Sequence, residues 1–151
     1  MFVRMTGLIS KDIATGGYSC DSWNGSQETC TALGADLPSI HSQEENVYVQ
    51  SLHGGEHSWL GLSDINSEGT FVWSDGTLFD FHYWAKHQPN NFDNEDCVHT
   101  LGFLRDHEYK WNDINCTDCH RFTCKKGNFP IVNKRTTIFM NSVNQNKIKK
   151  S

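Results

Sequence analysis

The nine residues Gln88-Pro89-Asn90-Asn91-Phe92-Asp93-Asn94-Glu95-Asp96 concentrate oxygen-bearing side chains around a single proline. A second polar group, Trp111-Asn112-Asp113, follows fifteen residues after Asp96. Amide and carboxylate oxygens are the ligands that a hard cation such as Ca²⁺ prefers, and Ca²⁺ takes about six to eight of them. Because the spacing is too irregular for one helix face, the pattern predicts ligands from a loop and a nearby strand. The alternative interpretation is a solvated turn, since Asn and Asp dominate turns.

Charge is unevenly distributed along a chain whose 151 residues are enough for one domain with a single core. Residues 1–126 hold all 18 acidic side chains and eight of the 13 basic ones, a net charge of −10, whereas residues 127–151 carry +5. The acidic body argues against nucleic acid as a partner and suits cation binding. Residues 127–151 contain few apolar residues and are predicted to be a disordered basic tail. No stretch of the sequence is long and apolar enough to span a membrane.

Six cysteines in so short a chain indicate an oxidising compartment, and therefore a secreted or extracellular protein. The first ten residues lack the apolar run of a signal peptide, so the cysteines and the beginning of the sequence disagree. We give the cysteines more weight. Cys116, Cys119 and His120 also match half of a zinc site, but no second Cys/His pair stands at a matching spacing. Spacing alone does not choose among the possible cysteine pairings.

Two short helices are predicted in the first half of the chain. Residues 42–45, Ser-Gln-Glu-Glu, form a capping box in which the hydroxyl and the carboxylate each satisfy a backbone N–H. The glycines at 54–55 end the helix that follows. An earlier helix is predicted over about residues 24–34, with Cys30 and Leu33 directed inward.

After residue 57 the pattern changes to short apolar runs separated by turn signals, which predicts strands. These runs cover residues 59–62, 71–73, 97–101, 110–111 and 122–125. The stretch between Ser74 and Asp96 has little periodicity, and a loop of that length in a compact domain is usually functional. Tyr83 and Trp84 are expected to anchor its base, although both are also typical core aromatics.

Together these pieces resemble the C-type lectin-like domain family. The matching stretches, in the order of the family, are Cys30-Thr31-Ala32-Leu33-Gly34-Ala35-Asp36-Leu37-Pro38-Ser39-Ile40-His41-Ser42-Gln43-Glu44-Glu45-Asn46, Trp59-Leu60-Gly61-Leu62-Ser63-Asp64, Gln88-Pro89-Asn90, Glu95-Asp96-Cys97-Val98, Trp111-Asn112-Asp113 and Phe122-Thr123-Cys124. The resemblance implies an α+β fold with two helices, antiparallel sheets and a long calcium-binding loop region. It covers residues 16–126, which we take as the domain. Residues 1–15 are then an N-terminal segment, and the segment before Trp23 is short and Gly-rich where relatives have a clear strand.

The resemblance also implies which side chains are joined and which hold Ca²⁺. Disulfides are implied for Cys30–Cys124 and Cys97–Cys116, and the two cysteines left over give the pair Cys20–Cys119. The sugar-binding Ca²⁺ would be held by Gln88, Asn90, Glu95, Asn112 and Asp113. A second, supporting Ca²⁺ would be held by Asp64, Glu68, Asn91 and Asp96. The Gln88–Pro89 peptide bond is expected to be cis, as in relatives.

The type of sugar follows less directly from the resemblance. Mannose-type relatives carry Glu-Pro-Asn at the position of Gln88-Pro89-Asn90, and galactose-type relatives carry Gln-Pro-Asp. This chain has an amide on both sides and matches neither pattern. Phe92 stands where galactose-selective relatives often place a stacking aromatic, which favours galactose-type over mannose-type ligands slightly; its alternative role is loop packing. With only Glu95 and Asp113 as carboxylates in the sugar-binding set, modest Ca²⁺ affinity is expected.

The function expected from the resemblance is a secreted, calcium-dependent lectin that binds glycans of the galactose or mannose type. Oligomers would add avidity, because single lectin sites bind weakly. The alternative is a protein-binding module of the same family that does not bind sugar. The sequence contains no nucleophile–base motif and no phosphate-binding glycine loop, so an enzyme is not expected.

Overall fold

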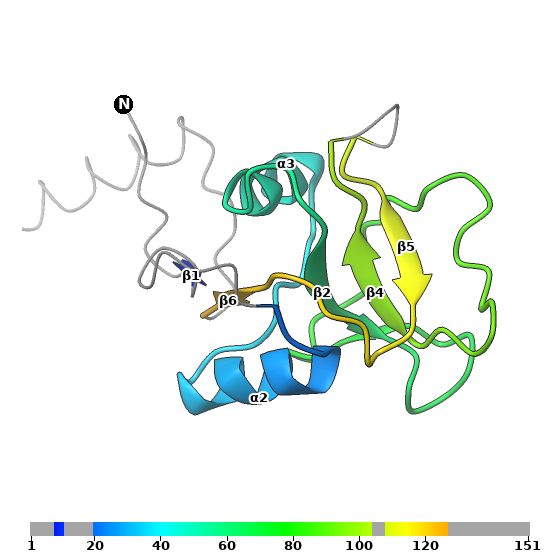
Figure 1. Cartoon of the computed structure of the whole chain (residues 1–151), viewed down its shortest axis with the longest axis horizontal. Helices are drawn as coiled ribbons and strands as arrows, with labels where there is room; N and C mark the ends of the chain where they lie inside the picture. The colour runs from blue at the N-terminus through cyan, green and yellow to red at the C-terminus, as the bar shows by residue number, and fades with distance from the viewer. Residues whose placement is uncertain (1–7, 11–19, 104–107, 127–151) are drawn as a thin grey trace, which may run out of the picture.

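The structure, a computed structural model, describes residues 8–10, 20–103 and 108–126. Its elements in chain order are β1 (Leu8–Ser10), α2 (Trp23–Ala32), α3 (Gln43–Ser51), β2 (Ser58–Ser63), β3 (Val72–Trp73), β4 (Cys97–Thr100), β5 (Trp111–Ile114) and β6 (Thr123–Lys125). The two helices lie on either side of β2 and β6 (Figure 1). The predicted α+β class with two helices and antiparallel strands is confirmed.

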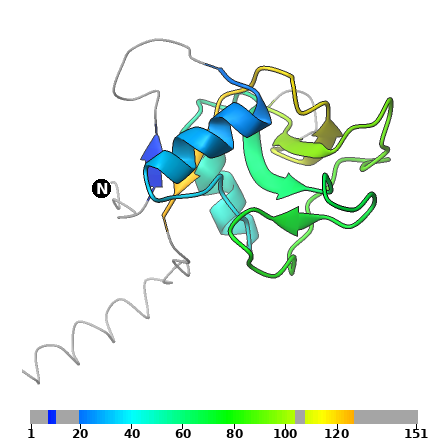
Figure 2. The same cartoon turned by 90° about the horizontal axis from the view of Figure 1, so that it is seen from below.

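The strands form two sheets in which all pairs are antiparallel. The larger sheet has the order β3-β2-β4-β5, and the smaller one pairs β1 with β6. In the larger sheet Val98 stands opposite Asp113 and His99 stands opposite Asn112. Both views place β1 and β6 at one end of the molecule and the loop between β3 and β4 at the other (Figure 1, Figure 2).

The smaller sheet lies partly in a segment that the sequence analysis placed before the domain. Strand β1 falls within residues 1–15, and its backbone pairs with β6 so that Ile9 stands opposite Cys124. Residues 8–10 therefore pair with the last described strand although they precede residue 16. The remainder of residues 1–15 and the predicted tail at 127–151 lie outside the described residues.

Helix α2 begins at an N-cap serine. The hydroxyl of Ser22 accepts a hydrogen bond from the backbone N–H of Gly25, and Cys30 is fully buried. Leu33 was expected to point inward but is 46% exposed. The helix ends at Ala32, so Leu33 is already the C-cap and no longer follows the helical periodicity that the prediction assumed.

Helix α3 begins at the predicted capping box. Ser42 is the N-cap, and its hydroxyl accepts from the N–H of Glu45 at 3.2 Å. The carboxylate of Glu45 accepts from the N–H of His41 at 2.8 Å, one residue earlier than a capping box requires. The helix ends at Ser51, before Gly54 and Gly55, which both adopt positive φ. In the part of the chain that the structure describes, no helix has the length and apolar character needed to cross a membrane.

Two clusters of buried residues form the core. One joins α2 to β2 and β6 around Trp59 and contains the Cys30–Cys124 disulfide. The other is centred on Trp73 and Trp111, and partly buried aromatics from the long loop pack against it. Because the second cluster includes Trp111, the first residue of β5, it supports the strand that carries Asn112 and Asp113.

Candidate functional site

The long loop between β3 and β4 is anchored on β5. The backbone N–H of Trp111 donates to the carbonyl of Tyr83, and the N–H of Ala85 donates to the carbonyl of Trp111, both at 2.8 Å. The ring of Trp84 lies 5.1 Å from that of Phe71 and 5.9 Å from that of Trp111, measured between centroids. The prediction that Tyr83 and Trp84 anchor this loop is confirmed. The backbone at Ala85 is therefore fixed against β5, immediately before the polar residues of the turn.

Asp113 connects the polar turn to the sheet. Its side chain is fully buried, and its two carboxylate oxygens accept from the backbone N–H groups of Asn90 at 3.1 Å and Asn91 at 2.7 Å. Within the turn, Oδ1 of Asn90 accepts from the N–H of Phe92, and Oδ1 of Asn91 accepts from the N–H of Glu95, both at 2.9 Å. Each of these oxygens keeps a further lone pair, so the turn gathers acceptors that can still bind a cation.

Gln88 and Glu95 complete this part of the turn. The Gln88–Pro89 peptide bond is cis, as expected. The Oε1 atom of Gln88 is buried and has no hydrogen-bond partner among the described residues. Desolvation, and then the charge of Asp113, raise the pKa of Glu95. A buried amide oxygen without a donor and two carboxylates that repel each other are the conditions that a bound cation would relieve.

A second group of oxygens forms where β2 ends. Asp64 is almost fully buried, its Oδ2 accepts from the N–H of Gly69 at 2.8 Å, and its Oδ1 has no hydrogen-bond partner in the described part of the chain. Desolvation raises the pKa of Glu68, followed by the charge of Asp64, a hydrogen bond with Asp64 and the charge of Asp96. A hydrogen bond with the side chain of Asn91 acts in the opposite direction. The other three residues expected at the second site therefore all act on Glu68.

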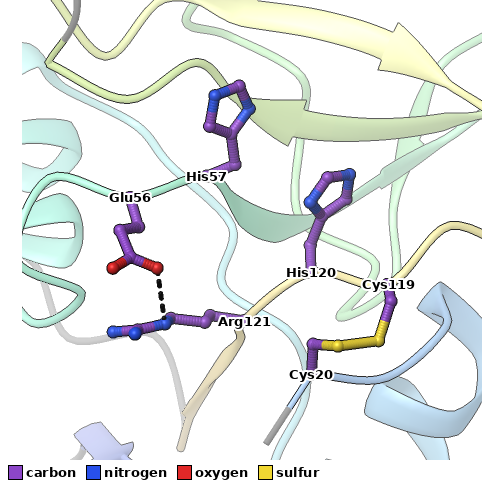
Figure 3. Close-up of a pocket in the computed structure, with 6 residues that line it drawn as sticks. All are labelled: Cys20, Glu56, His57, Cys119, His120 and Arg121. Atoms are coloured by element: carbon purple, nitrogen blue, oxygen red, sulfur yellow. Dashed lines mark ion pairs between the residues drawn. A yellow bond between two sulfur atoms is a disulfide. The ribbon is translucent and has the colours of Figure 1, made fainter. Parts of the chain in front are cut away.

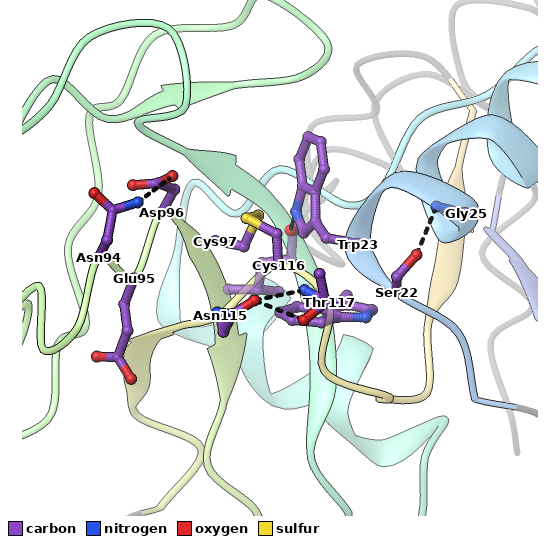
Figure 4. The surroundings of a disulfide bond; sticks show 12 residues. Ser22, Trp23, Gly25, Asn94, Glu95, Asp96, Cys97, Asn115, Cys116 and Thr117 are labelled. Atoms are coloured by element: carbon purple, nitrogen blue, oxygen red, sulfur yellow. Dashed lines mark hydrogen bonds between the residues drawn. A yellow bond between two sulfur atoms is a disulfide. The ribbon is translucent and has the colours of Figure 1, made fainter.

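The two groups are separated by alternation along the chain just before β4. Glu95 and Asp96 are consecutive, yet their side chains leave the backbone on opposite sides (Figure 4). Asp96 is on the side where it accepts from Nδ2 of Asn94 at 3.1 Å. The electrostatics follow the same division, because the charge of Asp113 acts on Glu95 and the charge of Asp96 acts on Glu68.

The chemistry of the donors fits Ca²⁺ better than a transition metal. Among residues 8–10, 20–103 and 108–126, no three His, Cys, Asp or Glu side chains are grouped so that they could hold a metal by themselves. Amide oxygens are therefore needed to complete either group, and a mixture of carboxylate and amide oxygens is typical of Ca²⁺. The residues that would supply the amides are Gln88, Asn90 and Asn112 in the first group and Asn91 in the second.

The half zinc site considered from the sequence is not formed. Cys116 is bonded to Cys97, and Cys119 is bonded to Cys20, so neither sulfur is a thiolate. Together with Cys30–Cys124, these are the three pairs that the sequence analysis described. The Cys97–Cys116 bridge joins the start of β4 to the residues that follow β5 (Figure 4).

One contact of a candidate ligand was not anticipated. Nδ2 of Asn112 lies 3.1 Å from Nε2 of His99, which is buried on β4. Thirteen residues separate the two in the sequence, and only the pairing of β4 with β5 places them opposite each other. Knowledge of the β4–β5 register would have revealed this contact, but the sequence pattern predicts strands without their register.

The fold and the site define a class of protein: a small disulfide-linked α+β domain with a polar, oxygen-rich loop held against a four-stranded antiparallel sheet. The family model described as "Lectin C-type domain" matches residues 19–126. The chain belongs to this family. Members of the family are carbohydrate binders rather than enzymes.

Individual relatives agree with this assignment. The chain is 38% identical over 106 residues to lectin BRA-3 of Megabalanus rosa, a match covering 68% of this chain and 64% of the relative. Among solved structures, the C-type carbohydrate-recognition domain of cow CD23, determined in the presence of a GlcNAc2Man3 oligosaccharide, has a TM-score of 0.65 and 31% identity. That match covers 76% of this chain and 86% of the other. A calcium-independent type II antifreeze protein also has a TM-score of 0.65, with 27% identity over 72% of this chain and 81% of its own.

Proposed function

We propose that this protein is a calcium-dependent carbohydrate-binding domain whose site is the turn held by Asp113. The observation that carries the proposal is the state of the turn itself. The buried Asp113 carboxylate holds Asn90 and Asn91 in place, while the buried Oε1 of Gln88 has no donor among the described residues. A buried oxygen without a partner among the described residues supports a bound cation at this turn over a merely solvated loop.

In this proposal each ligand has a separate task. The Ca²⁺ that contacts the sugar would be held by Gln88, Asn90, Glu95, Asn112 and Asp113. The second Ca²⁺ would be held by Asp64, Glu68, Asn91 and Asp96. When bound, the first Ca²⁺ would supply coordination positions for two vicinal sugar hydroxyls. Glu95 can only accept from those hydroxyls, whereas Gln88, Asn90 and Asn112 can donate from their amide nitrogens. The arrangement of acceptors and donors would thus select the hydroxyl geometry.

A galactose-type ligand is favoured over a mannose-type ligand by Phe92. Its ring is 74% exposed, and the backbone N–H of Phe92 is bonded to Oδ1 of Asn90, which keeps it next to the proposed sugar site. An exposed ring in this position is accessible to a ligand that binds at the turn. The apolar face of a galactose-type ring is such a partner, and stacking on an aromatic face would add to the affinity.

The setting of the domain follows from the same features. Three disulfides are typical of proteins that fold in an oxidising compartment, so we propose a secreted or extracellular location. The partners would be glycans and not nucleic acid, because residues 1–126 are strongly acidic. We propose binding without catalysis, and association of several copies where high avidity is required.

A second candidate function is a protein-binding module. The pair of amides at Gln88 and Asn90 matches neither sugar-type pattern, and a calcium-independent antifreeze protein has a similar fold. In this alternative the turn would be a structural element, and Phe92 would contact a protein surface.

The experiment that tests the proposal is retention of the oxidised protein on immobilised galactose and immobilised mannose, in Ca²⁺ and then in EDTA. We expect retention in Ca²⁺, release by EDTA and a preference for galactose. The exposed-carboxylate variant Asp93→Asn should behave like the wild type, because Asp93 belongs to neither ligand set. A folded protein that is retained on neither resin would overturn the lectin proposal and favour the protein-binding module.

A further inference from the structure

Three histidines form a stack beside the proposed cation site. The ring of His120 lies 4.6 Å from that of His99 and 5.9 Å from that of His57, and both pairs are nearly parallel. His57 and His120 also line a cavity of about 480 Å³ next to the Cys20–Cys119 disulfide and the Glu56–Arg121 ion pair (Figure 3). In parallel rings the nitrogen lone pairs lie in separate, parallel planes and do not converge on one point. The stack is therefore poorly arranged to bind one metal ion with all three side chains.

The innermost member of the stack, His99, contacts a proposed ligand of the cation. His99 is 2% exposed and stands opposite Asn112 in the β4–β5 pair, and its Nε2 lies 3.1 Å from Nδ2 of Asn112. An amide nitrogen only donates, so Nε2 of His99 must be the acceptor. If the amide were turned around, its oxygen lone pairs would face Nε2, and the NH₂ group would take the place of Oδ1.

The chemistry of His99 keeps Nε2 available as an acceptor. Nε2 of His99 accepts the hydrogen bond from Nδ2 of Asn112, so this nitrogen carries no proton. The ring is therefore neutral and carries one N–H. With Nε2 accepting from Asn112, that proton is on Nδ1.

His57 is the acceptor for this proton. Nδ1 of His99 and Nδ1 of His57 lie 3.4 Å apart, and one of the two must donate. If His99 donates to His57, the hydrogen bonds all run in one direction: the amide of Asn112 donates to His99, and His99 donates to His57. Reversal of this chain would require both rings to change tautomer and would turn the Asn112 oxygen toward His99.

We propose that His99 is a positioning residue for Asn112: it accepts from the Asn112 amide at Nε2, donates to His57 from Nδ1, and so keeps Oδ1 of Asn112 free for the cation. This inference rests on the proposed calcium-dependent function. It adds a residue outside the ligand set that decides which end of an amide ligand is presented. The second N–H of Asn112 remains able to donate to a sugar hydroxyl.

The first test is the tautomer of His99 in the ¹⁵N-labelled, calcium-loaded protein, measured from two-bond ¹H–¹⁵N correlations of the imidazole rings. We expect the pattern of a neutral ring with the proton on Nδ1 for His99 and on Nε2 for His57. A proton on Nε2 of His99 would overturn the inference, because that nitrogen could no longer accept from Asn112. A merely structural role of the ring would not fix the tautomer in this way.

The second test is a calcium titration of two variants at the same position. His99→Leu removes the acceptor and should weaken Ca²⁺ binding about fivefold, the value of one lost hydrogen bond. His99→Gln keeps an acceptor oxygen and should recover most of the loss. His82→Leu removes an exposed imidazole from the long loop and is the matched control.

The outcomes separate this inference from the proposed function. Equal Ca²⁺ affinity for the wild type and His99→Leu would overturn the positioning role while leaving the calcium site intact. If His99→Leu does not fold, the His99→Gln titration and the tautomer still decide, and a Gln variant that binds far more weakly than the wild type would count against the inference. A wild type that binds no Ca²⁺ would overturn the proposed function and this inference with it.

Discussion

Lys125 on β6 and Glu45 on α3 form a buried ion pair, with 2.6 Å between Nζ and Oε1 and side-chain exposures of 6% and 9%. The same ammonium donates to the carbonyl of Ser39 at 2.9 Å, and the other oxygen of Glu45 accepts from the N–H of His41. The start of α3 is therefore held to the last strand of the domain by one pair of charges.

Replacing one member of this pair should be costly. We expect Lys125→Met to lower the free energy of unfolding by about 3–5 kcal/mol, because Glu45 would be left charged and buried. The double variant Lys125→Met with Glu45→Leu should lose less free energy of unfolding, since it leaves no buried charge without a partner. Urea denaturation in the presence of Ca²⁺ measures both, with the exposed Lys126→Met as the control. A single variant as stable as this control would show that the pair does not support the fold.

Asp113→Asn should weaken Ca²⁺ binding by at least about tenfold. The substitution removes one of two carboxylates from the proposed ligand set and replaces an acceptor of a backbone N–H by an NH₂ group, so Asn90 or Asn91 loses its partner. Isothermal titration with Ca²⁺ provides the measurement. Asp93→Asn removes the same charge from an exposed position in the same turn, and its affinity should stay within about twofold of the wild type. Similar losses in both variants would point to net charge rather than to ligation.

Phe92→Ala should reduce the affinity for galactose about three- to tenfold and change the affinity for mannose little, because only a stacking contact is lost. Inhibition of resin binding by the free sugars measures both affinities. Phe103→Ala removes another exposed phenyl ring, 67% exposed, from a different loop and should change neither. An unchanged sugar preference in Phe92→Ala would leave the ring with a role in loop packing only.

Acid should destabilise the fold through the buried histidines. Burial lowers the pKa of His99 from 6.5 to about 2, and burial followed by His57 lowers the pKa of His120. Below about pH 6.5 these histidines bind protons in the unfolded chain but stay neutral in the folded chain. Their contribution to the free energy of unfolding is therefore fully present above pH 6.5 and is lost as the pH falls toward 2. Between about pH 7.5 and about pH 5, His99 alone should account for about 2 kcal/mol.

The measurement is urea denaturation in EDTA at the two pH values, so that Ca²⁺ binding does not contribute. His99→Gln has no group that titrates at this position, and its loss of stability between the two pH values should be smaller than that of the wild type. The lowered pKa values of Asp75 and Asp80 act only at lower pH, where these carboxylates become protonated. An equal loss in the variant and the wild type would assign the acid sensitivity to other groups.

The sequence predicts the parts of the fold that depend on local patterns. The capping box at Ser42, the apolar run of β2 and the Asn- and Asp-rich turn all depend on residues that are close in the chain, and each was located within a few residues. The prediction for Leu33 was wrong because one residue at a helix end decides whether a side chain still follows the helical period.

Contacts between distant strands could not be predicted in this way. The His99–Asn112 hydrogen bond depends on the β4–β5 register, and the Lys125–Glu45 pair joins residues 80 positions apart. Strand β1 was missed because three residues with little alternation give no strand signal and are defined by pairing with β6. For the candidate site, the residue types were visible in the sequence, while the buried, unsatisfied oxygens of Gln88 and Asp64 needed the folded chain.

The two long-range disulfides also determine what happens when the chain is cut. Cys20–Cys119 and Cys30–Cys124 link residues 99 and 94 positions apart, and both enclose the whole long loop. A protease that cleaves a single peptide bond between Cys30 and Cys97 would therefore release no fragment. The nicked protein would migrate as one species on a non-reducing gel and separate into two only after reduction. The exposed turn at residues 88–96 can thus be cut while the two halves of the domain stay covalently joined.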